Sequence, residues 1–291
     1  MKWPAFGYAK ASSLADLWRL QAEHGADARI LAGGQTLLAT LAFRLSDPKL
    51  LIDITRIAAL RGITLADGVL RLGALTRHAD LARDPQVARH APLLAEAAPL
   101  IAHPAIRNRG TIGGSLAYAD PAAELPACIL ALDATLILAS PAGERRVAAR
   151  DFFTGLFETA LRPDEIILAI EVPVATDATR SAIVEVARRS GDYAMAGLAA
   201  CLRLAGDGRV ETARLVYFGV GPGPVPAPRA AAALEGRAPD AATIAAAAAA
   251  LAQDLDPPAD LHGSPAMKLH LARVLTRRAL TRLATPTEIA A

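Results

Sequence analysis

Two glycine pairs followed by polar residues are the segments best suited to bind a ligand. In LAGGQTLL, Gly33-Gly34 is followed directly by Gln35 and Thr36 and then by a helical pattern. Adjacent glycines permit positive φ and let a ligand approach the backbone closely. Successive amide N–H groups in such a turn form an anion-binding concavity, which a following helix N-terminus strengthens. Taken alone, this pattern is more typical of a structural turn than of a phosphate site.

The second glycine pair, in IRNRGTIGGSLAYADPAAELPA, is more specific. Gly113-Gly114 has hydroxyl groups on both sides, at Thr111 and Ser115, and acidic residues follow it. One loop can donate amides to one phosphate, whereas two loops can bracket a pyrophosphate, which favours a dinucleotide cofactor. Neither G-x-G-x-x-G after a strand nor G-x-x-x-x-G-K-[ST] occurs, so the pattern favours a flavoprotein fold that uses other loops.

The elements around the first pair form a β–loop–α–β unit. A helix is predicted over 14–24, with Ser13 as N-cap and Gly25 at its end. ARIL then reads as a buried strand, TLLATLAFRL as a helix and LLIDI as a second buried strand. GITLADGVLRLG, with its Asp-Gly turn, predicts a hairpin. Around the second pair we expect helices over 77–83, 91–102 and 124–132 and a strand over 134–139.

Strands over 166–172 and 182–187 flank a predicted boundary at about 173–180. Beyond it, AMAGLAACLRLAGDGRVETARLVYFGVG predicts two long strands joined by a Gly-Asp-Gly turn. GPGPVPAPRAAA reads as a loop that leads into helices. AMKLHLARVLTRRALTRL predicts a solvated amphipathic helix rather than a binding element. Because strands and helices mix without regular βαβα alternation, the fold class is α+β.

The composition limits the classes of function. A chain of 291 residues with 53% apolar and 21% charged residues suits a globular protein of two domains. The net charge of +2, with basic and acidic residues interspersed, gives no reason to expect nucleic acid. The N-terminus has no apolar signal segment, and the alanine-rich run at 241–254 is shorter than the ~20 residues that a bilayer requires. We expect a soluble cytoplasmic protein without a transmembrane segment.

Two cysteines are too few for a metal cluster. Cys128 and Cys201 lie in separate apolar contexts, and neither has a second ligand at C-x-x-C spacing. We therefore expect two packed thiols and neither an iron–sulfur nor a zinc site within this chain.

Four motifs together resemble the FAD-binding medium subunit of the xanthine dehydrogenase and carbon monoxide dehydrogenase family. They are, in chain order, LAGGQTLL, IRNRGTIGGS-LAYADPAAELPA, DFFTG-LFETAL-RPDEII and ARRSGDYAMAG. The resemblance runs along nearly the whole chain. It implies an α+β, vanillyl-alcohol-oxidase-like FAD-binding domain at 1–176, in two subdomains of about 1–56 and 57–176. A small α+β C-terminal domain at 180–285 would follow.

The resemblance also implies which residues bind FAD. The pyrophosphate would lie against two runs of residues: Ala32, Gly33, Gly34, Gln35 and Thr36, and Thr111, Ile112, Gly113, Gly114 and Ser115.

Four further residues would lie near the cofactor. Glu124 stands where the family usually has an aspartate that makes polar contacts to it. Ile101 and Leu161 would lie beside the flavin ring, although both suit an ordinary core equally well, and Tyr193 would lie near the isoalloxazine. Glu185 stands where some members have a lysine, whose role does not transfer.

Several tempting residues have simpler interpretations. Arg107 and Arg109 flank the second pair, but structural salt bridges or a partner-facing surface are favoured over phosphate contacts. His103 precedes a proline and has no nucleophile nearby, so it is not expected to be catalytic. Asp120, before Pro121, suits a turn.

The resemblance implies an electron-transfer subunit of a molybdenum hydroxylase, without catalytic or metal-binding residues of its own. It would take electrons from an iron–sulfur small subunit, which receives them from a molybdopterin large subunit, and pass them to an external acceptor. A dimer of heterotrimers is the expected assembly. A free-standing FAD-dependent oxidoreductase is disfavoured because no acid–base or nucleophile constellation occurs. A flavin-less scaffold subunit is disfavoured because both glycine pairs are present.

Overall fold

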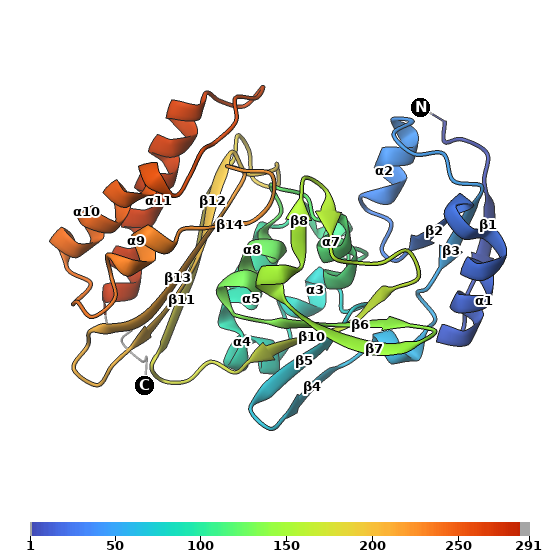
Figure 1. Ribbon diagram of the computed structural model, residues 1–291, viewed down its shortest axis with the longest axis horizontal. Coiled ribbons are helices and arrows are strands. Elements are labelled where there is room, and N and C mark those ends of the chain that lie inside the picture. The colour runs from blue at the N-terminus through green and yellow to red at the C-terminus, as the bar shows by residue number, and fades with distance from the viewer. Residues whose placement is uncertain (1, 286–291) are drawn as a thin grey trace.

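Three of the four β-sheets follow one another along the long axis of the molecule, with helices between and beside them, and the fourth is a small two-stranded hairpin (Figure 1). This architecture is seen in a computed structural model that describes residues 2–285. The predicted domain at 1–176 thus begins at a residue outside the described range. The N-terminal sheet lies at one end, the five-stranded central sheet in the middle and the C-terminal sheet at the other end. Each sheet with its helices is described below as one unit.

The N-terminal unit is a three-stranded parallel sheet in the order β1-β3-β2. Its elements are β1 (Gly7–Lys10), α1 (Leu14–His24), β2 (Ala28–Leu31), α2 (Leu37–Ala42) and β3 (Leu50–Asp53). The Ser13 hydroxyl accepts a hydrogen bond from the Asp16 amide at 3.1 Å and so begins α1, as predicted. The predicted β–loop–α–β unit is confirmed. The sequence did not predict β1, because its four residues show no alternation of buried and exposed positions.

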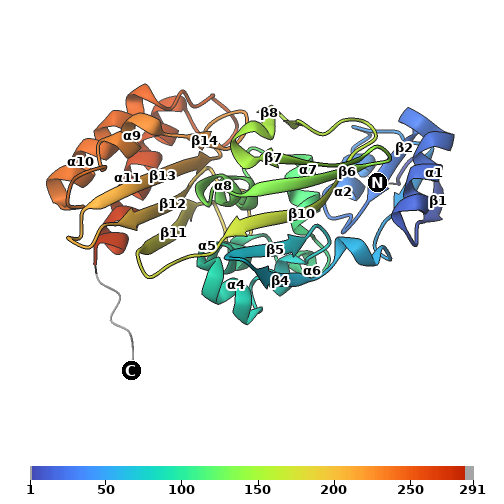
Figure 2. The same cartoon turned by 60° about the horizontal axis from the view of Figure 1, so that its bottom comes forward.

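The central unit is a five-stranded antiparallel sheet in the order β4-β5-β10-β6-β7, as Figure 2 shows from below. Its strands are β4 (Ile63–Ala66), β5 (Val69–Gly73), β6 (Thr135–Ser140), β7 (Gly143–Ala148) and β10 (Ile166–Pro173). The Asp67-Gly68 turn joins β4 and β5 with positive φ at both residues, as its hairpin geometry requires. The predicted hairpin is therefore confirmed.

Helices cover one face of the central sheet, and they carry the clearest departures from the prediction. They are α3 (His78–Leu81), α4 (Pro85–His90), α5 (Pro92–Ala97), α6 (Pro104–Arg107), α7 (Ile112–Tyr118) and α8 (Glu124–Ala131). The helix α4 was not predicted, although Asp84 caps it and Pro85 begins it. Gly113 and Gly114 lie within the first turn of α7 rather than in a loop. A small hairpin of β8 (Phe153–Gly155) and β9 (Glu158–Thr159) was also not predicted.

The C-terminal unit is a four-stranded antiparallel sheet, β11-β12-β13-β14, covered on its outer face by helices. Its elements are β11 (Thr179–Val186), β12 (Ala196–Leu204), β13 (Val210–Phe218), β14 (Val225–Pro226), α9 (Pro228–Ala232), α10 (Ala241–Ala250) and α11 (Pro265–Ala284). The two long strands and the last helix are confirmed. One face of α11 is more deeply buried than a solvated helix requires, since Lys268 and Thr276 lie in the interior.

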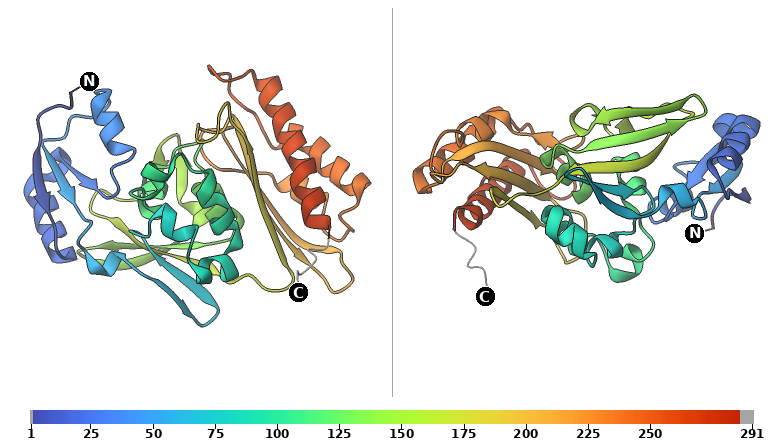
Figure 3. Two further views of the ribbon diagram at one scale, coloured as in Figure 1. Left: turned by 180° about the vertical axis from the view of Figure 1, so that it is seen from behind. Right: turned by 90° about the horizontal axis from the view of Figure 1, so that it is seen from below.

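Alternation along the strands separates the apolar side chains into clusters on the two faces of each sheet. Leu136 and Leu138 face the helices, whereas Ile137 and Ala139 face the N-terminal unit. The helices in turn lie between the central and C-terminal sheets, as seen from behind in Figure 3. We call the cluster shared by the central sheet, the helices α3, α4, α5, α7 and α8, and the inner face of the C-terminal sheet the central core.

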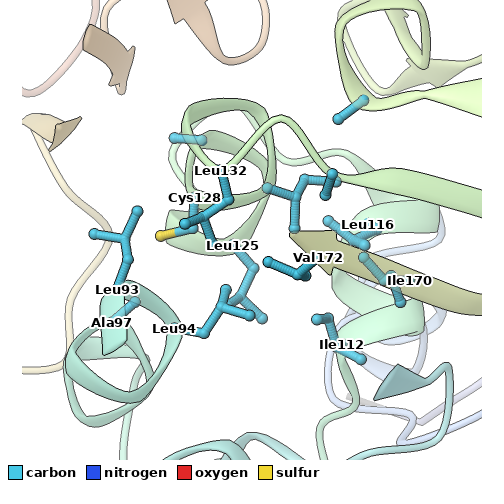
Figure 4. Close-up of a cluster of buried hydrophobic side chains, with 14 of the residues drawn as sticks. Leu93, Leu94, Ala97, Ile112, Leu116, Leu125, Cys128, Leu132, Ile170 and Val172 are labelled. Carbon is cyan, nitrogen blue, oxygen red and sulfur yellow. The ribbon is translucent and has the colours of Figure 1, made fainter. Parts of the chain in front are cut away.

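Both cysteines of the chain lie in the central core. Cys128 lies in it among Leu93, Ala97 and Leu132 (Figure 4), and Cys201 reaches it from β12. Both are buried free thiols, as predicted. Among the helices of the described residues, none is both long enough and apolar enough to cross a bilayer.

A glycine on β12 provides a test of this packing. Gly197 pairs with the fully buried Phe218, and an added Cβ would lie 2.0 Å from Phe218 Cζ. Because the ring must shift inside a packed core, we expect Gly197→Ala to lower the free energy of unfolding by about 2 kcal/mol. Urea denaturation measures this change.

The matched control is Gly206→Ala. Gly206 is exposed, and an added Cβ would meet no atom within 4 Å. Its effect should stay within about 0.5 kcal/mol. Equal destabilisation by the two substitutions would contradict the packing described for Gly197 and Phe218.

Candidate functional site

A cavity of about 860 Å³ opens where the N-terminal unit, the central helices and the C-terminal unit meet. Its wall comes from the β2–α2 loop, α7, the start of α8, and segments around Leu161 and Tyr193. Of the fourteen predicted site residues, thirteen line this cavity. They are Ala32, Gly33, Gly34, Gln35, Thr36, Ile101, Thr111, Gly113, Gly114, Ser115, Glu124, Leu161 and Tyr193.

Ile112 is the one that does not line the cavity. Its side chain is fully buried in the central core, beside Leu116 and Ile170 in Figure 4. Its amide donates to the Thr76 carbonyl oxygen at 2.9 Å. The motif therefore contains an anchoring residue between two positions that face the cavity.

The first glycine pair offers unused backbone donors. Within the described chain, the amides of Gly33, Gly34, Gln35 and Thr36 donate to no other protein group. Gly34 has φ 74°, and the Gln35 side chain donates to the Gly33 carbonyl oxygen at 2.9 Å, which fixes the turn. Successive free amides at the start of α2 are suited to an anionic group.

The second glycine pair differs from the first, because its amides are already bonded within the protein. Gly113 N–H donates to the Ala74 carbonyl oxygen at 2.9 Å, and Gly114 N–H donates to the Thr111 hydroxyl at 3.2 Å. An added Cβ at Gly113 would lie 2.6 Å from Ala74 Cβ, so this glycine permits close packing of α7 on the sheet. The expectation that both loops donate amides to a pyrophosphate therefore holds only for the first pair, whose amides are free.

The two glycine segments touch through their backbones. A Cβ at Gly33 would lie 2.2 Å from the Arg109 carbonyl oxygen and 2.8 Å from Gly110 Cα. No side chain fits in that space. The absence of side chains here brings the free amides of the first segment against the start of α7.

His78 lies behind this contact and was not identified from the sequence. It lines the cavity, is buried, and neither ring nitrogen has a hydrogen-bond partner among the described residues. Burial lowers the pKa of His78 to about 4, so the ring is neutral near pH 7. A Cβ at Gly110 would lie 2.9 Å from this ring, so the imidazole supports the second segment by packing. No spacing pattern marks such a histidine.

The apolar wall is held in place by an ion pair. Ile101 and Leu161 both line the cavity and pack in or against the central core. Each is therefore a core residue that is also available to contact a ligand in the cavity. Behind Leu161, Arg145 forms a two-pronged pair with the buried Glu165 at 2.6 and 2.8 Å. The same guanidinium donates to the Ala160 carbonyl oxygen at 2.6 Å. It also holds the pKa of the Glu165 carboxyl below its usual value.

Acidic side chains form another part of the wall. Glu124 is 7% exposed, and burial, with smaller contributions from Glu185 and Asp120, raises its pKa to about 8. Burial also raises the pKa of Asp120, whose carboxylate accepts from the Ala122 amide at 2.9 Å. Asp120 therefore does shape a turn, and it lines the cavity as well.

Tyr193 closes the cavity from the C-terminal side and is 62% exposed. Two residues before it, Gly191 has φ 86°, and its Cβ would lie 2.6 Å from the His103 ring. His103 is thus a packing partner of this loop. Arg107 donates to the carbonyl oxygens of Pro99, Ile101 and Ala102, which makes it a structural residue, although it forms hydrogen bonds instead of a salt bridge.

Comparison with known proteins identifies the family. The family model of the FAD binding domain in molybdopterin dehydrogenase matches residues 4–175, which is more than half of the chain. The chain belongs to this family. The model of the CO dehydrogenase flavoprotein C-terminal domain matches residues 181–283.

Relatives of the flavoprotein subunit match along nearly its full length. It is 42% identical over 282 residues to the 6-hydroxypseudooxynicotine dehydrogenase complex subunit alpha of Paenarthrobacter nicotinovorans, covering 97% of this chain and 95% of that protein. It is 38% identical to the carbon monoxide dehydrogenase medium chain of Hydrogenophaga pseudoflava, covering 95% and 96%.

Solved structures agree with these relatives. Carbon monoxide dehydrogenase from Hydrogenophaga pseudoflava superposes with a TM-score of 0.94 at 39% identity, covering 97% of this chain and 98% of that one. Quinoline 2-oxidoreductase from Pseudomonas putida 86 superposes with a TM-score of 0.92 at 41% identity, covering 98% of each chain.

These findings confirm the predicted family, fold class and cofactor. The chain is the FAD-carrying medium subunit of a molybdenum hydroxylase, a flavin-dependent oxidoreductase. The cavity fits FAD, because free amides at Gly33 to Thr36 suit its pyrophosphate and the volume suits a large ligand. The roles of single residues stay predictions.

The raised pKa of Glu124 makes stability depend on pH. Its folded-state pKa of about 8 exceeds its ordinary 4.5, so between these values the folded chain keeps a proton that the unfolded chain has released. The free energy of unfolding should therefore fall as the pH rises from about 5 to about 8. Glu124→Gln stays neutral throughout, so its melting temperature should depend much less on pH.

Glu171→Gln is the matched control for thermal melts over this range. Glu171 pairs with Arg71 and Arg146 away from the cavity, and these pairs keep its pKa below its ordinary value. Its replacement should lower stability without changing the slope above pH ~5. A slope that is identical in wild type and Glu124→Gln would contradict the assignment.

Proposed function

We propose that this subunit takes electrons from an iron–sulfur small subunit and passes them through FAD to an external acceptor. The observation that carries the proposal is the row of free amides at Gly33 to Thr36, which faces a cavity built by three units of the fold. Bound FAD supplies the redox chemistry. The chain's own part is to bind the cofactor, orient it and exclude water.

In this proposal the pyrophosphate lies against the first glycine segment. The amides of Gly33, Gly34, Gln35 and Thr36 are its donors, and Ala32 flanks them. From α7, Gly114 and Ser115 contribute a surface without bulk, because Gly114 is exposed and carries no side chain. Thr111 and Gly113 fix that surface through their internal hydrogen bonds.

The flavin ring would lie at the apolar end of the cavity. Ile101 and Leu161 would pack beside it, Tyr193 would cover it, and Glu124 would make a polar contact. The Arg145–Glu165 pair would hold Leu161 in position. Each of these residues would bind or orient the cofactor, and none would act as a nucleophile.

The mouth of the cavity suits a protein partner. Leu45, Phe157 and Tyr193 are large, exposed apolar residues that all line it. Phe157 also stacks edge-on with Tyr118 at 5.2 Å. Such apolar groups around a ligand opening are typical of interfaces. We assign this rim to the iron–sulfur subunit, since a short path between redox groups requires the partner at the opening.

The relatives' names guide the wider assembly. They describe a subunit of a dehydrogenase complex and a medium chain, so large and small partners are implied. We propose a molybdopterin large subunit beyond the iron–sulfur subunit, a dimer of heterotrimers as the assembly, and the cytoplasm as its location. We also propose domains at 1–176, with subdomains of about 1–56 and 57–176, and at 180–285.

A substitution at Gly114 tests the cofactor site. A Cβ there would lie 2.9 Å from the Thr111 hydroxyl and about 4 Å from Ala32 Cβ, in the space between the two segments. We expect Gly114→Leu to reduce the FAD content by at least about tenfold while the chain stays folded. FAD released by denaturation and quantified by its absorbance measures the content, and circular dichroism reports the fold.

Gly206→Leu, on an exposed turn, should leave the FAD content unchanged. Equal FAD content in both variants would refute the site.

Purification from the native source should recover a cluster protein and a large molybdenum protein with the chain. Recovery of the chain alone would refute the electron-transfer assembly.

A further inference from the structure

A lysine is buried near the start of α11. Lys268 is only 2% exposed, and its Nζ atom donates to the Gly219 carbonyl oxygen at 3.0 Å and to Asp260 Oδ2 at 2.5 Å. Asp260 Oδ1 in turn accepts from the amides of His262 and Gly263 at 2.8 and 3.0 Å, which fixes the turn before α11. The ammonium therefore joins this turn to the residue that follows β13.

Gly219 connects this lysine to two segments of the cavity wall. Its amide donates to the Pro121 carbonyl oxygen at 2.8 Å, and Pro121 directly follows Asp120, which lines the cavity. Gly219 has φ 75°, and an added Cβ would lie 2.7 Å from the Ala194 carbonyl oxygen. Ala194 directly follows Tyr193, which closes the cavity. Gly219 is thus packed between the segment before α8 and the segment that carries Tyr193.

A second contact joins the turn before α11 to the segment that carries Tyr193. We call residues 187–195, which lie between β11 and β12, the Tyr193 loop. Arg188 Nη2 of this loop donates to the Leu261 carbonyl oxygen at 3.1 Å. The turn before α11 therefore touches one end of the Tyr193 loop, and Gly219 packs against the other end.

Stability alone gives little reason for a charge at this position. Moving an ammonium into the interior costs free energy, and apolar side chains of similar size often replace a buried ion pair without loss. What the ammonium adds is direction, because it holds the oxygen atoms of Gly219 and Asp260 at fixed points. We propose that Lys268 is a positioning residue for the cofactor, which holds Gly219 and the Tyr193 loop so that Tyr193 closes over the flavin. This inference rests on the proposed function, in which Tyr193 covers the flavin ring.

The rate of FAD release from the purified assembly, followed by flavin fluorescence, tests this role. Lys268→Met removes the charge and keeps the length of the side chain. We expect it to release FAD about tenfold faster and to change the visible circular dichroism of the bound flavin, because the Tyr193 loop is no longer held. Asp260→Asn is a milder variant of the same contact, since the Asp260 side chain is 38% exposed. It should shift both quantities in the same direction.

Thr276→Val is the matched control. Thr276 is also buried on α11, and its hydroxyl forms a hydrogen bond with that of Tyr217 on β13 at 2.6 Å. Its replacement should lower the melting temperature of the full chain but leave the release of FAD and the flavin circular dichroism unchanged. An equal acceleration of FAD release in Thr276→Val and Lys268→Met would show a general loss of stability and overturn the proposal.

A double-mutant cycle with Tyr193→Ala separates the inference from the proposed function. If Lys268 acts through the Tyr193 loop, Lys268→Met should accelerate FAD release by less than about twofold once Tyr193 has been replaced. Additive effects of the two substitutions, or unchanged release in Asp260→Asn, would overturn the inference alone. A wild-type assembly that carries no FAD would refute the proposed function and the inference with it.

Discussion

The close contact between the backbone of Gly33 and that of Arg109 and Gly110 is the constraint on which the site depends. These segments belong to different units, and the space between them is too small for a methyl group. The contact fixes the free amides of the first segment relative to α7. The hydrogen bonds from Ile112 and Gly113 to the residues after β5 then tie α7 to the central sheet. Cofactor geometry in this subunit is thus set by backbone packing more than by side-chain chemistry.

The polar side chains of the cavity serve two different purposes. The Arg145–Glu165 pair keeps an ionised carboxylate buried by giving it charged and backbone donors, which stabilises the apolar wall near Leu161. Among the residues that the structure describes, Glu124 has no such partner, and burial raises its pKa to about 8, so that it is neutral near pH 7. One carboxyl group therefore supports the wall as an anion, whereas the other lines the cavity in its neutral form. Their environments, rather than their residue type, make this difference.

Sequence reasoning predicted the elements that have strong local signals. The Asp-Gly hairpin, the Ser13 cap and the long strands β12 and β13 each carry turn residues or an unbroken periodicity. The short edge strand β1 and the small β8–β9 hairpin lack both, so they depend on tertiary pairing that no local pattern encodes.

The sequence predicted which residues line the candidate site, but it did not predict which of them offer free hydrogen-bond donors. Thirteen of the residues that the motif resemblance implied do line one cavity. The sequence analysis, however, expected both glycine pairs to donate amides to the cofactor. Whether an amide is free depends on distant partners such as Ala74 and Thr76, which the motif does not contain. The sequence did not predict His78 for the same reason. Only the tertiary structure shows that its ring is buried with no hydrogen-bond partner among the described residues.

The central core has a consequence for how the chain folds. Side chains on β12 and β13, including Cys201 and Phe218, pack into the same cluster as Leu94 and Leu125 of the preceding helices. Two segments that family models match separately therefore share one interior, and exposing either would uncover the other's apolar surface. The predicted boundary near 173–180 therefore does not divide the chain into two parts that unfold independently. Heat or denaturant should unfold both segments in one transition, and an exchange of the C-terminal part between homologues would succeed only where that interior is inherited with it.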